Sequence, residues 1–129
     1  MNSINFKKEI AASVDAAVER VTKALAAEGF GILTRIDMHT KIKEKTGKDI
    51  VPTVILGACN PQLAFEAYTA NSDVASLLPC NAVIREVAPG KISVELAKPT
   101  SMMQILGDSN LTELAREADT RLQRVLTSV

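Results

Sequence analysis

The sequence predicts an α+β fold with about five strands in a single domain, residues 1–129. Apolar residues alternate in some segments, as they do in strands, and recur at helical spacing in others. These segments follow the order strand, helix, strand, short helix, strand, helix, strand, strand, short helix, long helix. A chain of 129 residues is long enough for one domain and not comfortably for two.

The first half of the chain predicts two strands and two helices. Alternation at the start, in "INFKKEI", predicts the first strand. The helix that follows has Ser13 as its N-cap and Gly29 just past its C-terminus. A short lysine-rich helix, closed by Gly47, comes later and is expected to have a solvated face. Between the two helices lies a second strand with these residues on one face: Phe30, Ile32, Thr34, Ile36 and Met38.

The middle of the chain predicts a buried strand followed by a helix. Residues 52–59, "PTVILGAC", form a nearly continuous apolar run, which predicts a strand covered on both faces. Asn60-Pro61 then predicts a helix start, because Asn is a good N-cap and Pro suits the first helical position.

The last part of the chain predicts a hairpin and two helices. Two strands, 80–87 and 91–97, are joined by a turn whose Pro89-Gly90 centre suits type II geometry. In the short helix that follows, Met102, Ile105 and Leu106 resemble a core stripe. The long final helix, 109–127, has an apolar stripe and a capping-box pattern in Asn110 and Glu113.

Composition excludes several classes of function. The net charge is zero and aromatic residues are 3% of the chain, which argues against a nucleic-acid partner. No apolar run approaches the ~20 residues of a membrane span, so no membrane association is expected. The N-terminus lacks a signal-peptide pattern, which indicates a cytoplasmic protein with reduced cysteines. Two cysteines cannot complete a structural zinc site, and no metal site is assigned.

The two cysteines form the main candidate site. "ILGACNP", residues 55–61, and "LLPCN", residues 77–81, each place Asn directly after Cys. The candidate ligand or redox residues are therefore Cys59, Cys80, Asn60 and Asn81. Because Cys59 precedes a helix start, it is expected to be the more acidic thiol, whereas Cys80 should stay closer to its ordinary pKa. The competing interpretation is that both cysteines are small buried apolar residues.

With "GFGILTRID", these two motifs resemble the bacterial and archaeal family called domain of unknown function 302. The resemblance covers roughly residues 3–106, and the additional helix 109–127 lies mostly outside it. It implies a fold like that of the TATA-binding protein, with a mainly antiparallel sheet and helices packed on one face. In that sheet the strand that ends at Cys59 and the strand that begins at Cys80 would be antiparallel neighbours. Both thiols would then lie at one end of the sheet, and we expect them beside a partly enclosed pocket.

The resemblance assigns no activity, and catalytic residues and cofactors stay unassigned. Three functions remain open. The first is a small cytoplasmic binding or accessory domain whose two-cysteine site takes a small molecule or a soft metal ion. The second is a thiol redox or sulfur-handling enzyme that uses Cys59 and Cys80, although the chain lacks a C-x-x-C motif. The third is a structural homodimer module with packing cysteines. A homodimer is expected from the apolar stripe of the last helix and the doubly covered strand.

Overall fold

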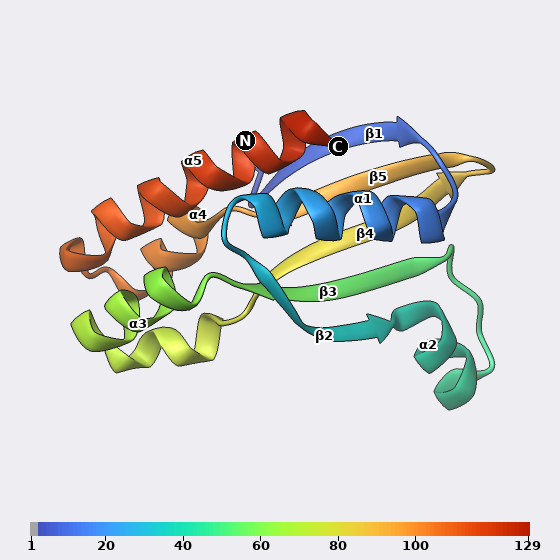
Figure 1. Ribbon diagram of the computed structural model, residues 1–129. Helices are drawn as coiled ribbons and strands as arrows, with labels where there is room; N and C mark the ends of the chain where they lie inside the picture. Colours follow the sequence, from blue (N-terminus) through green and yellow to red (C-terminus); the bar gives the residue numbers. More distant parts are fainter. Residues whose placement is uncertain (1–2) are drawn as a thin grey trace.

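A computed structural model describes residues 3–129 and contains a five-stranded antiparallel sheet (Figure 1). The strands lie in the order β1-β5-β4-β3-β2. Their bounds are β1 Asn5–Ala11, β2 Gly31–Asp37, β3 Thr53–Cys59, β4 Cys80–Ala88 and β5 Lys91–Ala97. The predicted α+β fold is confirmed, and so is the hairpin, since β4 and β5 pair directly across the turn at Gly90.

Within residues 3–129, five α-helices and three 3₁₀ turns accompany the sheet. The helices are α1 Val14–Ala27, α2 Met38–Thr46, α3 Pro61–Ala70, α4 Pro99–Met103 and α5 Thr112–Ser128. The turns are η1 Ser72–Leu77, η2 Gln104–Leu106 and η3 Ser109–Leu111. No helix in residues 3–129 has both the length and the apolar character needed to cross a bilayer.

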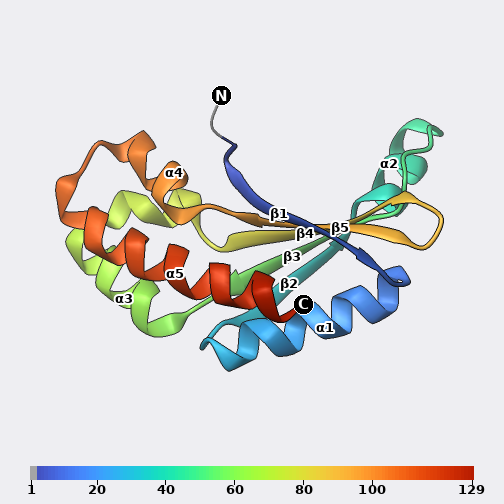
Figure 2. The ribbon, with the colours of Figure 1, turned by 90° about the horizontal axis from the view of Figure 1, so that it is seen from above.

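Helices α1 and α5 cover the same face of the sheet (Figure 2). Their apolar sides meet the alternate, inward-facing residues of β3, β4 and β5, and together these residues form the main core. The apolar stripe of α5 is therefore used within the chain, with Leu122 and Val125 almost completely buried. The largest buried side chains of this core are Val21, Leu25, Val54, Leu56, Ile84, Ile92, Val94, Leu96 and Val125.

The predicted ends of the first two helices are confirmed by their hydrogen bonds. The Ser13 side chain accepts a hydrogen bond from the backbone N–H of Ala16 at 3.1 Å, as an N-cap does. Gly29 has φ +85° and Gly47 has φ +72°, so both end their helices in the left-handed region that glycine adopts without strain.

A β-bulge makes the predicted face of β2 wrong. Ile32 is opposite Ala58 and Thr34 is opposite Gly57, so Leu33 is an extra residue between them. The bulge reverses the alternation after Ile32, which packs against the core, whereas Ile36 pairs with Ile55 on the other face. Leu33 itself is 65% exposed.

Two predictions near the C-terminal helix are also wrong. Asn110 is not an N-cap of a capping box, because α5 begins two residues later, after a 3₁₀ turn that Asp108 caps. Glu113 pairs instead with Arg116 at 3.1 Å. The predicted core stripe of the short helix fails at Ile105, which is 69% exposed because the helix changes to a 3₁₀ turn after Met103.

A second, smaller core lies beyond the end of the sheet. Its buried members are Ala67 of α3, Val74 of η1 and Leu111 of η3. Leu78, Met103, Leu106 and Leu114 pack around them. Helices α3 and α4 and the first turns of α5 thus form an end group of helices beside the two cysteine motifs (Figure 1).

Candidate functional site

The two cysteines lie at the same end of neighbouring antiparallel strands, as predicted. In the β3–β4 ladder Ala58 is opposite Cys80, and Cys59 is the next residue along β3, opposite Gly31 of β2. Both cysteines are free thiols. Alternation puts successive side chains on opposite faces of a strand, so Cys59 does not face Cys80 directly across the ladder. The chain leaves the sheet at Cys59 to begin α3.

An apolar cavity lies between this end of the sheet and the end group of helices. Both Cys59 and Cys80 border it, together with Asn60. The cavity has a volume of about 50 Å³ and is only partly enclosed. That is roughly a third of the 150 Å³ of a protein cavity known to bind benzene. The remaining wall is apolar: Phe30, Ala58, Leu63, Ala64, Ala67, Leu78, Pro99, Met103, Leu111, Leu114, Ala115 and Ala118.

The first cysteine motif contains a glycine because there is no room for a side chain at position 57. Strand alternation places Gly57 on the face of β3 where a Cβ atom would collide with the side chain of Thr34 and with the ring of Pro79. Pro79 belongs to the second motif and follows a cis peptide bond from Leu78. The glycine therefore lets the two motifs pack against each other directly.

Asn60 has a structural role that its motif position predicts, and a second that it does not. Its Oδ1 atom accepts a hydrogen bond from the Leu63 N–H at 3.1 Å, which confirms it as the N-cap of α3. Its Nδ2 atom donates to the backbone carbonyl of Glu28 at 3.4 Å. The side chain is 6% exposed, so Asn60 joins the start of α3 to the end of α1.

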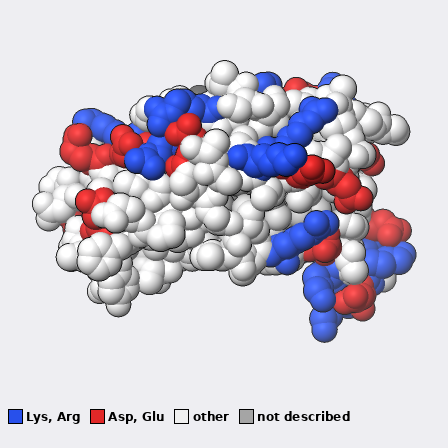
Figure 3. Space-filling view, in the orientation of Figure 1, with Lys and Arg blue, Asp and Glu red and all other residues white. Residues whose placement is uncertain are grey.

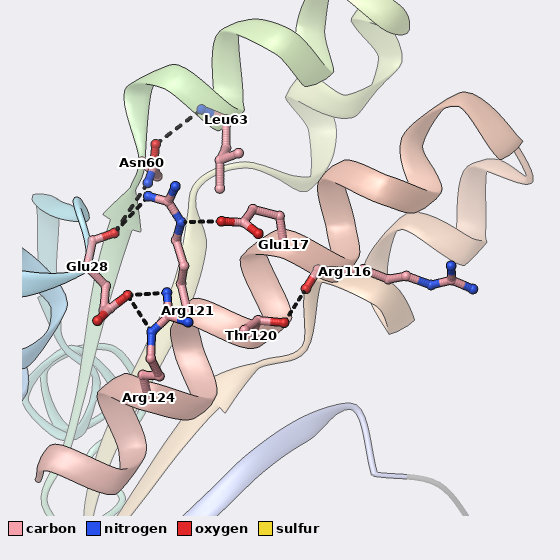
Figure 4. Close-up of polar contacts among 8 residues, drawn as sticks. All are labelled: Glu28, Asn60, Leu63, Arg116, Glu117, Thr120, Arg121 and Arg124. Carbon is pink, nitrogen blue, oxygen red and sulfur yellow. Dashed lines mark hydrogen bonds and ion pairs between the residues drawn. The ribbon is translucent and has the colours of Figure 1, made fainter.

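The carbonyl of Glu28 is shared with α5 (Figure 4). Arg121 donates to it at 3.3 Å and also binds Glu117 at 2.9 Å. Arg124 donates to the Glu28 carboxylate at 2.7 and 3.0 Å, and these hydrogen bonds lower the pKa of that carboxyl group. The ends of α1 and α3 are thereby fixed to the middle of α5, beside the cavity.

The pKa of the Cys80 thiol is raised from 9.0 to about 11, mainly by burial and to a smaller extent by the nearby Cys59 and Asp119. The prediction that Cys80 stays close to its ordinary pKa is therefore wrong. The cause is the apolar environment, which disfavours a thiolate. Cys80 is a protonated thiol at neutral pH.

Residues 6–129 match the family described as "Domain of unknown function DUF302". The chain belongs to the DUF302 family. The match extends through α5, beyond the segment 3–106 that the resemblance in the motifs covers. The crystal structure of an uncharacterized conserved DUF302 protein from Bacillus stearothermophilus is similar over 98% of each chain, with 30% sequence identity and a TM-score of 0.90. No curated protein matches the chain.

Asn81 and the histidine His39 lie away from the cavity of this DUF302 domain. Asn81 is exposed and does not border the cavity, so the two Cys-Asn pairs are not equivalent. His39 accepts a hydrogen bond at Nδ1 from the Thr53 N–H at 3.0 Å, near the opposite end of β3. Among residues 3–129 no group of three or more His, Cys, Asp or Glu side chains is arranged to hold a metal ion.

The cavity wall and helix α3 of the DUF302 domain carry few charged side chains. The surface over α3 is mostly white in Figure 3, whereas Lys, Arg, Asp and Glu gather over α2 and along α5. Helix α3 carries a single charged residue, Glu66. The surroundings of the cavity therefore favour an uncharged or soft ligand over a phosphate.

Sequence reasoning missed the far wall of the cavity. Phe30 comes from the chain before β2, Met103 from α4, and Ala115 and Ala118 from α5. The signal that could have indicated α5 is the pair of alanines three residues apart within its apolar stripe, because small residues leave room beside a packed helix. Nothing in the sequence places Met103 beside the cysteines, since more than twenty residues separate it from Cys80.

Proposed function

We propose that this protein is a small binding domain whose ligand occupies the apolar cavity and contacts Cys59 and Cys80. The observation that carries the proposal is that two cysteines from different strands border one cavity with an otherwise apolar wall. Few polar groups in a mainly apolar pocket are typical of ligand sites, where the polar groups set orientation and specificity. A cytoplasmic location, where thiols stay reduced, is part of the proposal.

The cavity restricts the ligand to a small group without a strong charge. About 50 Å³ admits only a few atoms. A charged group would be desolvated by the apolar wall, which includes Leu63, Leu78 and Pro99, with no opposite charge on that wall. Suitable ligands are therefore a thiol-reactive group of a small molecule or a soft metal ion that the sulfur atoms bind directly.

A binding function agrees better with the cysteines than thiol–disulfide exchange does. Exchange requires a thiolate. Cys80, with a pKa of about 11, is protonated at neutral pH and would be a slow resolving thiol.

Methyl methanethiosulfonate is a suitable probe because it adds only a methylthio group to a thiolate and releases methanesulfinate. We expect the native protein to be modified at Cys59, at a rate that falls as the cavity is filled. Ala64 borders the cavity and is half-buried on α3, so Ala64→Val and Ala64→Leu should slow modification in that order. Ala70→Leu is the matched control, because Ala70 is exposed at the end of the same helix.

Peptide mass spectrometry gives the rate at each cysteine. Graded protection by the Ala64 variants, with Ala70→Leu at the wild-type rate, would support ligand access through the cavity. Equal rates in all four proteins would contradict it, because they would show that Cys59 reacts from the outside. Equal, slow rates at the one remaining cysteine of the Cys59→Ser and Cys80→Ser proteins across pH would indicate that the cysteines only pack.

A further inference from the structure

The cavity has a third sulfur atom on its wall. Met103, the last residue of α4, borders the same cavity as Cys59 and Cys80. The three side chains come from β3, β4 and α4, so the sulfur atoms approach the cavity from three separate elements. Met103 is half-buried and also packs against the smaller core, which holds α4 in place.

Two thiols and a thioether are the ligand set of a soft, monovalent metal. Thiolate and thioether sulfur select Cu(I) among the first-row metals. Zinc in structural sites takes four Cys or His ligands, and the cavity wall provides neither a histidine nor a carboxylate. An iron–sulfur cluster is excluded for the same reason, because it requires four cysteines or their equivalents.

The start of α3 offsets part of the charge of such a site. Cu(I) bound by two thiolates has a net charge of −1, and Cys59 directly precedes the N-cap of α3, a helix of ten residues. The positive end of that helix favours a negative charge at this position. Apart from Asn60, the cavity wall provides no polar side chain that would compete with the sulfur atoms for the ion.

We propose that this cavity binds one Cu(I) ion through the sulfur atoms of Cys59, Cys80 and Met103. The inference rests on the proposed binding function and names the ligand class of that site. Each thiol that binds the ion releases its proton to solvent, and no electron transfer takes place. The thioether of Met103 binds as a neutral ligand and completes a three-coordinate site.

The test is an anaerobic titration of the full chain with Cu(I) in competition with bathocuproine disulfonate. We expect one bound ion per chain, and loss of competitive binding in both Cys59→Ser and Cys80→Ser. We expect Met103→Leu to weaken binding about tenfold, because the ion then keeps only two of its three sulfur ligands. Met102→Leu is the matched control, because Met102 is the preceding residue and does not border the cavity.

X-ray absorption of the copper-loaded protein provides a readout that a purely structural role of Met103 would not change. The wild-type and Met102→Leu proteins should show three sulfur neighbours, and Met103→Leu should show two. Equal affinities and equal sulfur counts in the two methionine variants would overturn Met103 as a ligand. Binding that survives either cysteine variant, or that bathocuproine disulfonate abolishes in the wild type, would overturn the site.

Failure of the copper inference can be distinguished from failure of the proposed binding function. If cavity-dependent modification by methyl methanethiosulfonate holds while Cu(I) does not bind, the cavity takes another small ligand and only the copper inference is wrong. If modification is independent of the cavity and Cu(I) also fails to bind, both are wrong.

Discussion

Gly57 of β3 lies so close to Pro79 that a Cβ atom on the glycine would be 2.8 Å from the proline Cγ atom. This contact joins the two cysteine motifs two residues before Cys59 and one residue before Cys80. Since real Cβ atoms do not approach other heavy atoms within 3.0 Å, any larger residue at Gly57 must displace Pro79 and thereby the start of β4. The position of Cys80 relative to the cavity therefore depends on the absence of a side chain at Gly57.

Gly57→Ala should destabilise the protein by about 1–3 kcal/mol, because the added methyl group overpacks the contact with Pro79 and Thr34. Gly31→Ala is the control, since no atom lies within 4 Å of a Cβ atom there, and its effect should stay within about 0.5 kcal/mol. Urea denaturation of both variants measures the difference. Equal stabilities would show that Pro79 moves away without cost.

The two asparagines that follow the cysteines should differ in their effect on stability. Asn60→Ala removes the N-cap of α3 and the contact with Glu28, so it should cost about 1–2 kcal/mol. Asn81→Ala changes an exposed side chain and should have an effect within about 0.5 kcal/mol. Thermal unfolding of the two variants compares them directly. If Asn81→Ala lost as much stability as Asn60→Ala, the capping role of Asn60 would not explain why an asparagine follows Cys59.

The metal-free protein should lose stability as the pH rises from about 9 to about 11. The folded-state pKa of Cys80 is raised from 9.0 to about 11, so its thiol is protonated in both states below pH 9. Above pH 9 the unfolded thiol ionises first, and this favours unfolding until the folded thiol also ionises near pH 11. The full difference corresponds to roughly 3 kcal/mol.

Cys80→Ala removes this thiol, so the difference in stability between the wild type and Cys80→Ala reports on the titration of Cys80. The free energy of unfolding of the wild type should approach or cross that of Cys80→Ala as the pH rises through this range. Two curves that stay parallel from pH 8 to pH 11 would show that Cys80 does not titrate with a raised pKa.

We also expect a homodimer, with a mass in light scattering of twice the 13.8 kDa of the chain. Large apolar side chains remain on the surface, among them Phe65 at 67% and Ile105 at 69% exposure, and a second copy would remove such surface from water. The apolar stripe of α5 no longer supports the prediction, because it packs on the sheet. A mass of 13.8 kDa at micromolar concentration would contradict the prediction.

Local patterns in the sequence predicted most of the fold. Helix ends such as Ser13, Gly29 and Asn60 follow from capping chemistry within a few residues of the chain, and all three are confirmed. The bulge at Leu33 could not be predicted in this way, because it is a property of the pairing with β3. The alternation of apolar residues in one strand does not show where the neighbouring strand has one residue fewer.

The candidate site could be predicted only in part, because some of its properties depend on tertiary packing. The motifs and their resemblance to a family placed Cys59 and Cys80 at one end of the sheet beside a pocket. The raised pKa of Cys80 depends on residues of α4 and α5 that surround it, and a single sequence does not show which helices those are. The same tertiary packing brings Met103 to the cavity.

The separation of the two cores has a consequence for how a ligand reaches the cavity. The smaller core around Ala67, Val74 and Leu111 shares no buried residue with the main core under α1. Helix α3 can therefore open as a local cooperative unit while the β-ladder stays intact. Amide hydrogens of α3 should exchange with solvent faster than those of β5, which lies between two strands. Local opening of α3 then widens the partly enclosed cavity, and its frequency sets how often a ligand larger than the resting volume enters.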